Sequence, residues 1–241
     1  MRGRMPLVLC YHAVSDAWED DLAVDPEVFQ AQIRLALRSG FTPVSLSEAV
    51  IGSGKLLHIT FDDAFRNIRG SLDFLARVGV PATVFVCSDL AATGSPLPIF
   101  AAGGARAAPG SCAETMTWDA LRELAAAGVE IGSHTCSHPH LTTMLDIDLR
   151  RELTESRERI GDELGQECAY LAYPFGEQNA RVRAAARAAG YTASFAQAST
   201  VIRRDPQAIF RISIYGRDSL KRVALKLSPL GRVMSYVRRS G

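Results

Sequence analysis

The stretch Leu56-Leu-His-Ile-Thr-Phe-Asp62-Asp63 joins a mostly apolar run to two adjacent carboxylates. A continuous apolar run of this length is typical of a strand buried on both faces of a parallel sheet. The carboxylates that follow it are costly to bury unless they are paired or bind a metal. The stretch therefore predicts a parallel sheet and a chemical site at the end of one of its strands. We interpret His58, inside the run, as a core histidine with a satisfied hydrogen bond.

The same alternation of strands and helices extends along the chain. Short apolar runs predict further strands over residues 7–11, 83–86, 129–132, 170–173, 191–195 and 210–215, and helical periodicity predicts helices over 26–39, 68–78, 118–127, 146–164 and 180–189. This alternation predicts an α/β fold, in which parallel strands are covered by helices. About seven repeats in 241 residues favour a closed or nearly closed barrel over two domains.

The composition excludes several classes of protein. With 22% charged and 47% hydrophobic residues, the chain is not a disordered, collagen-like or coiled-coil protein. The net charge of +1 gives no general attraction to nucleic acid. The charge is unevenly placed, however, because residues 201–241 carry ten Lys and Arg against two Asp.

The spacing of the cysteines and the N-terminal residues together predict the compartment in which the protein is found. The five scattered cysteines do not have the spacing of a disulfide framework, which favours a reducing compartment. The apolar run after the basic residues Arg2 and Arg4 is too short for a signal peptide, and no run is long enough to span a membrane. We therefore expect a cytoplasmic protein, with membrane association left open by the basic C-terminal residues.

Three predicted strand ends carry residues suited to chemistry: Asp62-Asp63, the segment His134-Thr-Cys-Ser-His138, and Tyr173-Pro-Phe-Gly176. In barrels of this class the carboxyl ends of the strands form the active site. Two histidines four residues apart, joined by a carboxylate from elsewhere, make a metal site with open positions.

These segments resemble the motifs of the NodB-type polysaccharide deacetylases, carbohydrate esterase family 4. Thr60-Phe-Asp-Asp63 resembles the first motif, His134-Thr-Cys-Ser-His138-Pro followed by Leu141 resembles the second, and Tyr173-Pro-Phe-Gly176 resembles a short form of the third. Tyr11-His12 and residues 40–48 are similar to the branch that deacetylates poly-N-acetylglucosamine.

The resemblance implies a distorted (β/α)7 barrel and removal of acetyl groups from sugars. It implies Asp62 as general base, and Asp63, His134 and His138 as ligands of a divalent metal. The ion expected is Zn²⁺, with Co²⁺, Ni²⁺ and Fe²⁺ as alternatives for the same ligands. The backbone N–H of Phe175 would stabilise the oxyanion.

The chain departs from the family in its proton donor, because no histidine follows His140. The late Leu-x-His motif that supplies the acid is therefore missing. Asp62 could return the proton that it accepts, or His12 or His140 could donate one. The arginine that normally precedes the third-motif proline is also missing, and Arg211 could take its place by pairing with Asp62 or could form an ordinary structural ion pair.

Other residues are candidates for contact with the substrate. Tyr173, Pro174 and Arg211 belong to the predicted site, and Trp18 lies in an acidic loop near its presumed mouth. We interpret Trp118 as a packing residue. We interpret Cys136, between the two histidines, as a bystander.

The C-terminal residues form a separate region in this interpretation. We expect a catalytic domain over residues 1–215 and a basic amphipathic helical tail over 216–241. The tail either packs on the domain or, through residues 217–239, lies on an anionic membrane surface beside a lipid-linked substrate.

The sequence thus predicts a metal-dependent hydrolase that removes N-acetyl groups from an N-acetylated glycan or lipid-linked sugar. The alternatives are an O-deacetylase, a deacetylase of a small amide, and a catalytically degenerate glycan-binding member. We expect no nucleic-acid partner, because the remainder of the chain is acidic.

Overall fold

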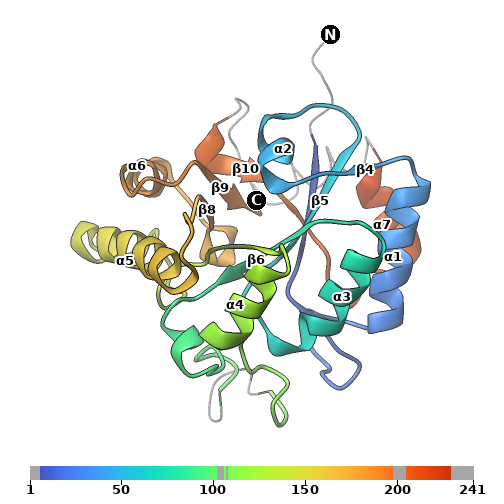
Figure 1. Cartoon of the computed structure of the whole chain (residues 1–241), viewed down its shortest axis with the longest axis horizontal. Coiled ribbons are helices and arrows are strands. Elements are labelled where there is room, and N and C mark those ends of the chain that lie inside the picture. The colour runs from blue at the N-terminus through green and yellow to red at the C-terminus, as the bar shows by residue number, and fades with distance from the viewer. Residues whose placement is uncertain (1–5, 102–105, 107, 198–204, 229–241) are drawn as a thin grey trace. The chain divides into compact units, whose positions relative to one another are not determined.

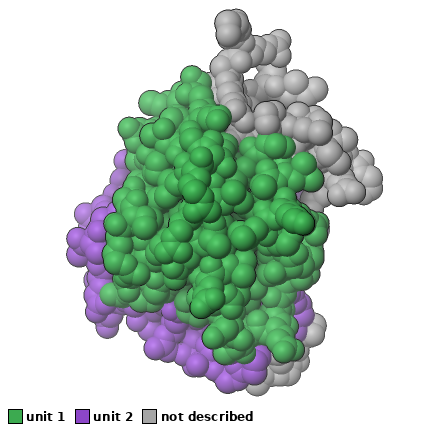
Figure 2. All heavy atoms as spheres, turned by 90° about the vertical axis from the view of Figure 1, so that its right-hand side faces the viewer, with its two compact units in different colours: residues 1–61, 67–82, 211–241 green, residues 62–66, 83–210 purple. Residues whose placement is uncertain are grey.

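The computed structural model describes residues 6–101, 106, 108–197 and 205–228 (Figure 1). The chain divides into two compact units, coloured separately in Figure 2. Unit 1 comprises residues 1–61, 67–82 and 211–241, and unit 2 comprises residues 62–66 and 83–210. Both units are assembled from segments that are distant in the sequence, so the predicted boundary at residue 215 stays a prediction.

The sheet of unit 1 is parallel and is centred on β1 (Leu7–Tyr11). This strand pairs with β5 (Leu56–Phe61) and with β11 (Ile212–Ser213), and β4 (Thr42–Pro43) pairs with the other edge of β5. Every residue of β1 is buried, as expected for a strand covered on both faces. A small separate ladder joins β2 (Ala13–Val14) to β3 (Ala23–Val24).

Four helices belong to unit 1: α1 (Pro26–Arg38), α2 (Leu46–Ile51), α3 (Arg69–Arg77) and α7 (Leu220–Leu227). α1 begins where the sequence predicts, because the Asp25 carboxylate accepts hydrogen bonds from the N–H groups of Glu27 and Val28. Its inner face buries Phe29, whose ring meets the ring of Tyr11 edge to face at 5.0 Å.

The sheet of unit 2 is also parallel. Its order is β10 (Ile209–Phe210), β9 (Ala193–Ala196), β8 (Tyr170–Ala172), β7 (Glu130–Ser133) and β6 (Ala82–Val86). Close packing in this sheet requires Gly132. A Cβ atom at this position would lie 2.6 Å from the Phe85 ring, which itself packs on Phe195.

Three helices cover this sheet: α4 (Trp118–Ala126), α5 (Asp146–Leu164) and α6 (Ala180–Ala188). α5 packs against both α4 and α6 and also against β7. Trp118 is buried at the start of α4, as predicted for a packing residue. Short 3-10 turns complete the chain over Arg66–Ile68, Leu90–Ala92, Pro174–Gly176 and Pro206–Ala208.

The predicted strand over residues 210–215 is wrong in its extent. β10 pairs with β9 in unit 2, whereas β11 pairs with β1 in unit 1, and Arg211 stands between them. The side chain of Arg211 is buried and donates a hydrogen bond to the Thr60 hydroxyl at 3.1 Å. The apolar pattern continues through this break, which is why periodicity alone does not reveal it.

The first part of the predicted tail forms α7, which Ser219 caps. Val223 and Leu227 are buried on one side of this helix. The rest of the predicted tail, residues 229–241, lies outside the described residues. No helix in the described part of the chain is long and apolar enough to cross a bilayer.

Candidate active site

Asp63, His134 and His138 come together in unit 2. One carboxylate oxygen of Asp63 lies 3.5 Å from Nε2 of His134 and 3.5 Å from Nε2 of His138. Asp63 is 3% exposed and His134 is 2% exposed, so both groups are withdrawn from bulk water. The three predicted metal ligands thus converge on one point, although they come from loops about seventy residues apart in the sequence.

The spacing of these atoms fits a small divalent cation. Ligand atoms in a tetrahedral shell with bonds of about 2.0–2.2 Å lie roughly 3.3–3.6 Å from one another, which includes the separations found here. The donors are two imidazoles and one carboxylate, a set that zinc and the late first-row metals share. The residues present therefore fit the metal that the resemblance implies.

The orientation of His134 is fixed by a backbone carbonyl. Its Nδ1 lies 2.8 Å from the carbonyl oxygen of Ala172, the last residue of β8. A carbonyl only accepts hydrogen bonds, so Nδ1 carries the proton, and Nε2 is left with a lone pair directed toward Asp63. This arrangement is typical of metal-binding histidines, in which the second ring nitrogen sets the tautomer.

His138 is held by aromatic contacts. Its ring meets the His134 ring at 4.8 Å and the Phe175 ring at 4.6 Å, both edge to face. On the solvent side, the His140 ring lies nearly parallel to Phe175 at 3.9 Å, and its Nδ1 is 3.1 Å from the Glu177 carboxylate. The Phe175 side chain, 41% exposed, thus connects a predicted ligand to the rim of the site.

The backbone of the site is unusual. In the described part of the chain, the non-glycine residues with positive φ are Asp63, Ala64, Thr135, His138 and Phe175, with φ between 50° and 71°. Four of them belong to the three strand-end segments that the sequence singles out, and Ala64 directly follows the first of these segments. Left-handed backbone costs about 1 kcal/mol or more per ordinary residue, and such residues cluster at functional sites.

The Asp62 segment is anchored beside these ligands. The Met116 N–H donates to the Ala64 carbonyl at 2.8 Å, and the Arg66 N–H donates to the Glu114 carbonyl at 2.9 Å. These bonds tie the loop after β5 to residues 114–116. The Asp62 side chain is buried next to Asp63, a position that suits a base acting beside a bound cation.

The third segment is built on buried side chains. Tyr173 donates its hydroxyl hydrogen to the Gln207 carbonyl at 2.9 Å, and both Tyr173 and Pro174 are buried. Gly176 has φ of +68°, and a Cβ atom there would lie 2.5 Å from Cβ of Gln197. Contact of Tyr173 and Pro174 with the substrate stays a prediction.

The remaining predicted residues lie in unit 1. The His12 ring runs nearly parallel to the Tyr215 ring at 6.5 Å, and His58 is a core histidine whose Nδ1 lies 2.8 Å from the Val44 carbonyl. Trp18 is 5% exposed, and its contact with the substrate stays a prediction. The proton-donor roles of His12 and His140, and the pairing of Arg211 with Asp62, stay predictions.

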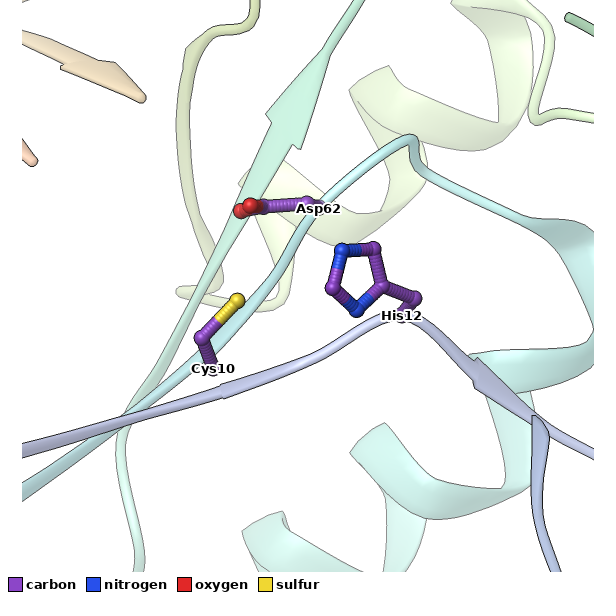
Figure 3. A group of neighbouring side chains, drawn as sticks. All are labelled: Cys10, His12 and Asp62. Atoms are coloured by element: carbon purple, nitrogen blue, oxygen red, sulfur yellow. The ribbon is translucent and has the colours of Figure 1, made fainter. Parts of the chain in front are cut away.

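Figure 3 shows the side chains of Cys10, His12 and Asp62 individually. Cys10 belongs to β1, His12 follows that strand, and Asp62 follows β5. The two strands are paired in register, with Tyr11 opposite Phe61. His12 and Asp62 therefore leave equivalent positions of neighbouring parallel strands.

Two cysteines, Cys136 and Cys87, are buried close to the site. Burial raises the pKa of Cys136 to about 11, and its Sγ donates to the Glu152 carbonyl at 3.5 Å. Burial and the nearby carboxylates of Asp63 and Asp62 likewise raise the pKa of Cys87. Both residues are therefore thiols at neutral pH, which agrees with the interpretation of Cys136 as a bystander.

Sequence reasoning missed Glu152. This residue lies on the buried face of α5, which also carries Leu149, Leu153, Ser156 and Ile160. An acidic residue within an otherwise apolar helical stripe is the signal that could have found it.

Comparisons with known proteins agree with this geometry. The family model for polysaccharide deacetylases matches residues 50–194, more than half of the chain and all three strand-end segments. The chain is 23% identical to YxkH of Bacillus subtilis (strain 168) over 192 residues. That match covers 76% of this chain and 61% of YxkH, so the chain spans about three fifths of its relative.

Two solved structures show the fold. BC0361, a polysaccharide deacetylase from Bacillus cereus, superposes with a TM-score of 0.76 at 19% identity, covering 94% of this chain and 70% of its own. IcaB from Ammonifex degensii gives 0.76 at 22% identity, covering 93% of this chain and 97% of its own. These likenesses confirm the predicted fold class, the distorted (β/α) barrel of the NodB type.

Proposed function

Since the chain belongs to the polysaccharide deacetylase family, we propose that it is a metal-dependent hydrolase that removes N-acetyl groups from an N-acetylated glycan or glycolipid. The observation that carries this proposal is the convergence of Asp63, His134 and His138 beside the buried Asp62. A protein that only binds glycan has no need of a buried carboxylate next to a metal-binding triad.

A divalent cation held by Asp63, His134 and His138 would polarise the acetyl carbonyl and lower the pKa of a water molecule. Asp62 takes a proton from the attacking water, whose oxygen bonds to the carbonyl carbon. The Phe175 N–H donates to the oxygen on which negative charge develops. The C–N bond then breaks as Asp62 passes its proton to the nitrogen, which gives acetic acid and a free amine. The acid loses its proton to solvent and leaves as acetate.

The rim of the site supports a sugar substrate. Phe175 presents an exposed ring, and His140, Glu177 and Thr142 place polar groups around it, with Thr142 donating to Glu177 at 3.4 Å. Apolar ring faces bordered by hydrogen-bonding groups match the alternating C–H and O–H surfaces of a pyranose. This part of the proposal concerns the class of substrate and not the identity of the sugar.

The test is acetate release from N-acetylglucosamine oligomers and from a lipid-linked N-acetylsugar. Wild type, Asp62→Asn and His134→Ala would each be stripped of metal and reloaded with zinc or cobalt. We expect metal-restored release by wild type, strongly reduced release by Asp62→Asn, and none above background by His134→Ala. Equal release by stripped and reloaded wild type would refute the metal dependence.

We also propose that the C-terminal residues contact an anionic membrane surface, consistent with a lipid-linked substrate and a cytoplasmic location. In support, α7 exposes Leu220 and Leu225 beside Lys221 and Arg222, while its other side is buried. Vesicles containing phosphatidylserine should sediment the wild type but not a Leu220→Ser/Lys221→Glu/Leu225→Ser variant. Equal sedimentation of a variant truncated after Ser228 would limit the contact to α7.

A further inference from the structure

Glu152 is a buried acidic residue on the helix that follows the metal-binding segment. It lies on the inner face of α5 and is 4% exposed. In the described residues, no lysine, arginine or histidine lies within 4 Å of its carboxylate. A buried charge without a cationic partner is costly unless several hydrogen bonds satisfy it.

The hydrogen bonds of Glu152 all go to one segment. Its Oε2 accepts from the N–H groups of Cys136 at 2.8 Å and Ser137 at 3.0 Å, and its Oε1 accepts from the Ser137 hydroxyl at 2.6 Å. Cys136 and Ser137 connect the predicted ligands His134 and His138. Glu152 therefore contacts the metal-binding segment at its centre, between the two imidazoles.

The same segment is also held through its carbonyl groups. The N–H groups of Ser88 and Asp89 donate to the carbonyls of Thr135 and Cys136, each at 3.1 Å. Within the segment, the His138 N–H donates to the Thr135 hydroxyl at 3.1 Å. The carbonyls are thus held by the loop after β6, and the amides are held by Glu152.

This double attachment matters because the segment is strained. Thr135 and His138 have φ of 71° and 64°, values that L-residues keep only where the surroundings enforce them. Removal of the Glu152 carboxylate would leave the buried N–H of Cys136 and the partly buried N–H of Ser137 without this acceptor, and would allow the strained residues to relax. The distances from the two Nε2 atoms to the Asp63 carboxylate would then change, because His138 directly follows Ser137 in the chain.

We propose that Glu152 is a positioning residue that holds His134 and His138 in the arrangement that binds the metal. This inference rests on the proposed function, because it takes the Asp63, His134 and His138 group to be a metal site. Glu152 acts through the backbone of residues 136 and 137 and does not touch the substrate or the ion. Its charge also gives stronger hydrogen bonds than a neutral amide would, since bonds to an ionised acceptor are roughly twice as strong.

The experiment compares Glu152→Ala, Glu152→Gln and Ser137→Ala with wild type. Glu155→Ala and Glu155→Gln are matched controls, because Glu155 lies one turn away on the exposed face of α5. Zinc affinity is measured by competition with a chelator, the cobalt-loaded proteins are compared by their visible d–d absorption, and the metal-free proteins are compared by thermal unfolding.

We expect Glu152→Ala to weaken zinc binding by about 10- to 100-fold and to alter the cobalt spectrum, as loss of a group that orients metal ligands typically does. Glu152→Gln keeps one acceptor oxygen and should fall between Glu152→Ala and wild type. Ser137→Ala should show the smallest loss of the three, and both Glu155 variants should match wild type.

Folded Glu152→Ala protein with wild-type zinc affinity and an unchanged cobalt spectrum would overturn the inference. If Glu152→Ala does not fold, unchanged affinity and spectrum in both Glu152→Gln and Ser137→Ala would overturn it equally. Failure of wild type itself to bind zinc or cobalt would instead refute the proposed metal site, and the role of Glu152 with it.

Discussion

The polar groups at the strand ends are held in different ways in unit 1 and in unit 2. In unit 1, the Thr60 hydroxyl donates to the Leu9 carbonyl, the Tyr11 hydroxyl donates to Gln32, and Arg211 donates to Thr60, all on ordinary backbone. In the described part of unit 2, five non-glycine residues have positive φ, and they include Asp63 and His138 of the candidate metal site. The first arrangement satisfies buried groups internally, whereas the second uses strained backbone to direct ligands toward one point.

The clearest example of this difference is a pair of histidines, one in each unit. His58 in unit 1 and His134 in unit 2 are both buried, and in each the Nδ1 lies 2.8 Å from a backbone carbonyl. The Nε2 of His134 lies 3.5 Å from the Asp63 carboxylate of the candidate metal site. The same hydrogen bond therefore serves packing in one unit and ligand orientation in the other.

The largest expected effect separates these histidines. His134→Ala should abolish stoichiometric zinc binding and reduce deacetylation by about 10³-fold or more, because it removes one of three ligands. His58→Gln should lower the unfolding temperature but leave zinc stoichiometry and the rate per folded molecule close to wild type. Calorimetric titration and acetate release check both, and equal zinc loss in the two variants would contradict the comparison.

The next effect distinguishes the base from the ligands within unit 2. Asp62→Asn should reduce kcat by about 10²–10⁴-fold while the chain still binds zinc, because only proton transfer is lost. Asp63→Asn, one residue later, should lose zinc affinity as well. Metal analysis of the two purified proteins, combined with their rates, tests the assignment. Loss of zinc from Asp62→Asn would instead indicate that Asp62 is the metal ligand and Asp63 is the base.

A smaller effect concerns the stability of unit 1. Burial lowers the pKa of His58 from 6.5 to about 4, so the folded protein disfavours its protonated form. The stability from this neutral histidine is fully present above pH 6.5 and is lost as the pH falls toward 4, by at most about 3 kcal/mol. Urea unfolding between pH 4 and 7 should give a shallower pH dependence for His58→Leu than for wild type. Parallel curves for the two proteins would reject this assignment.

The smallest effect tests the backbone strain itself. Ala64 has φ of 50°, so Ala64→Gly should stabilise the protein by up to about 1 kcal/mol. Ala36 is equally buried but lies inside α1, where Ala36→Gly should destabilise by about 1 kcal/mol. The two substitutions remove the same methyl group, so opposite signs in denaturant unfolding identify strain at the site. If both substitutions change the free energy of unfolding in the same direction, the measurement would contradict backbone strain at Ala64.

Most of the fold could be predicted because local signals agree with the tertiary structure. The Asp25-Pro26 pair marks the start of α1, and the apolar run over residues 56–61 coincides with β5. The break at Arg211 could not be predicted, because exchange of pairing partners between β10 and β11 leaves no mark in local hydropathy. The burial of Trp18 likewise depends on contacts that are distant in the sequence.

The candidate ligands of the site could be predicted from side-chain type and spacing, whereas the contacts that hold these ligands in place could not. Asp63, His134 and His138 carry recognisable chemistry in short segments. His134 is oriented by the backbone carbonyl of Ala172. Every residue type has a backbone carbonyl, so the sequence carries no signal for this contact. Glu152 contacts its segment only after α5 packs on β7, and its partners are backbone amides that any residues at 136 and 137 would supply.

The attachment of Glu152 also sets how slowly part of the loop exchanges hydrogen with solvent. The amide hydrogens of Cys136 and Ser137 point at a buried carboxylate, although neither residue belongs to a helix or strand. In heavy water these two sites should retain their protons about as long as the adjoining strand β7, even without metal. We expect a loop with that protection to be rigid before any ion arrives, so that uptake of the proposed metal would be a docking event and not a local folding event.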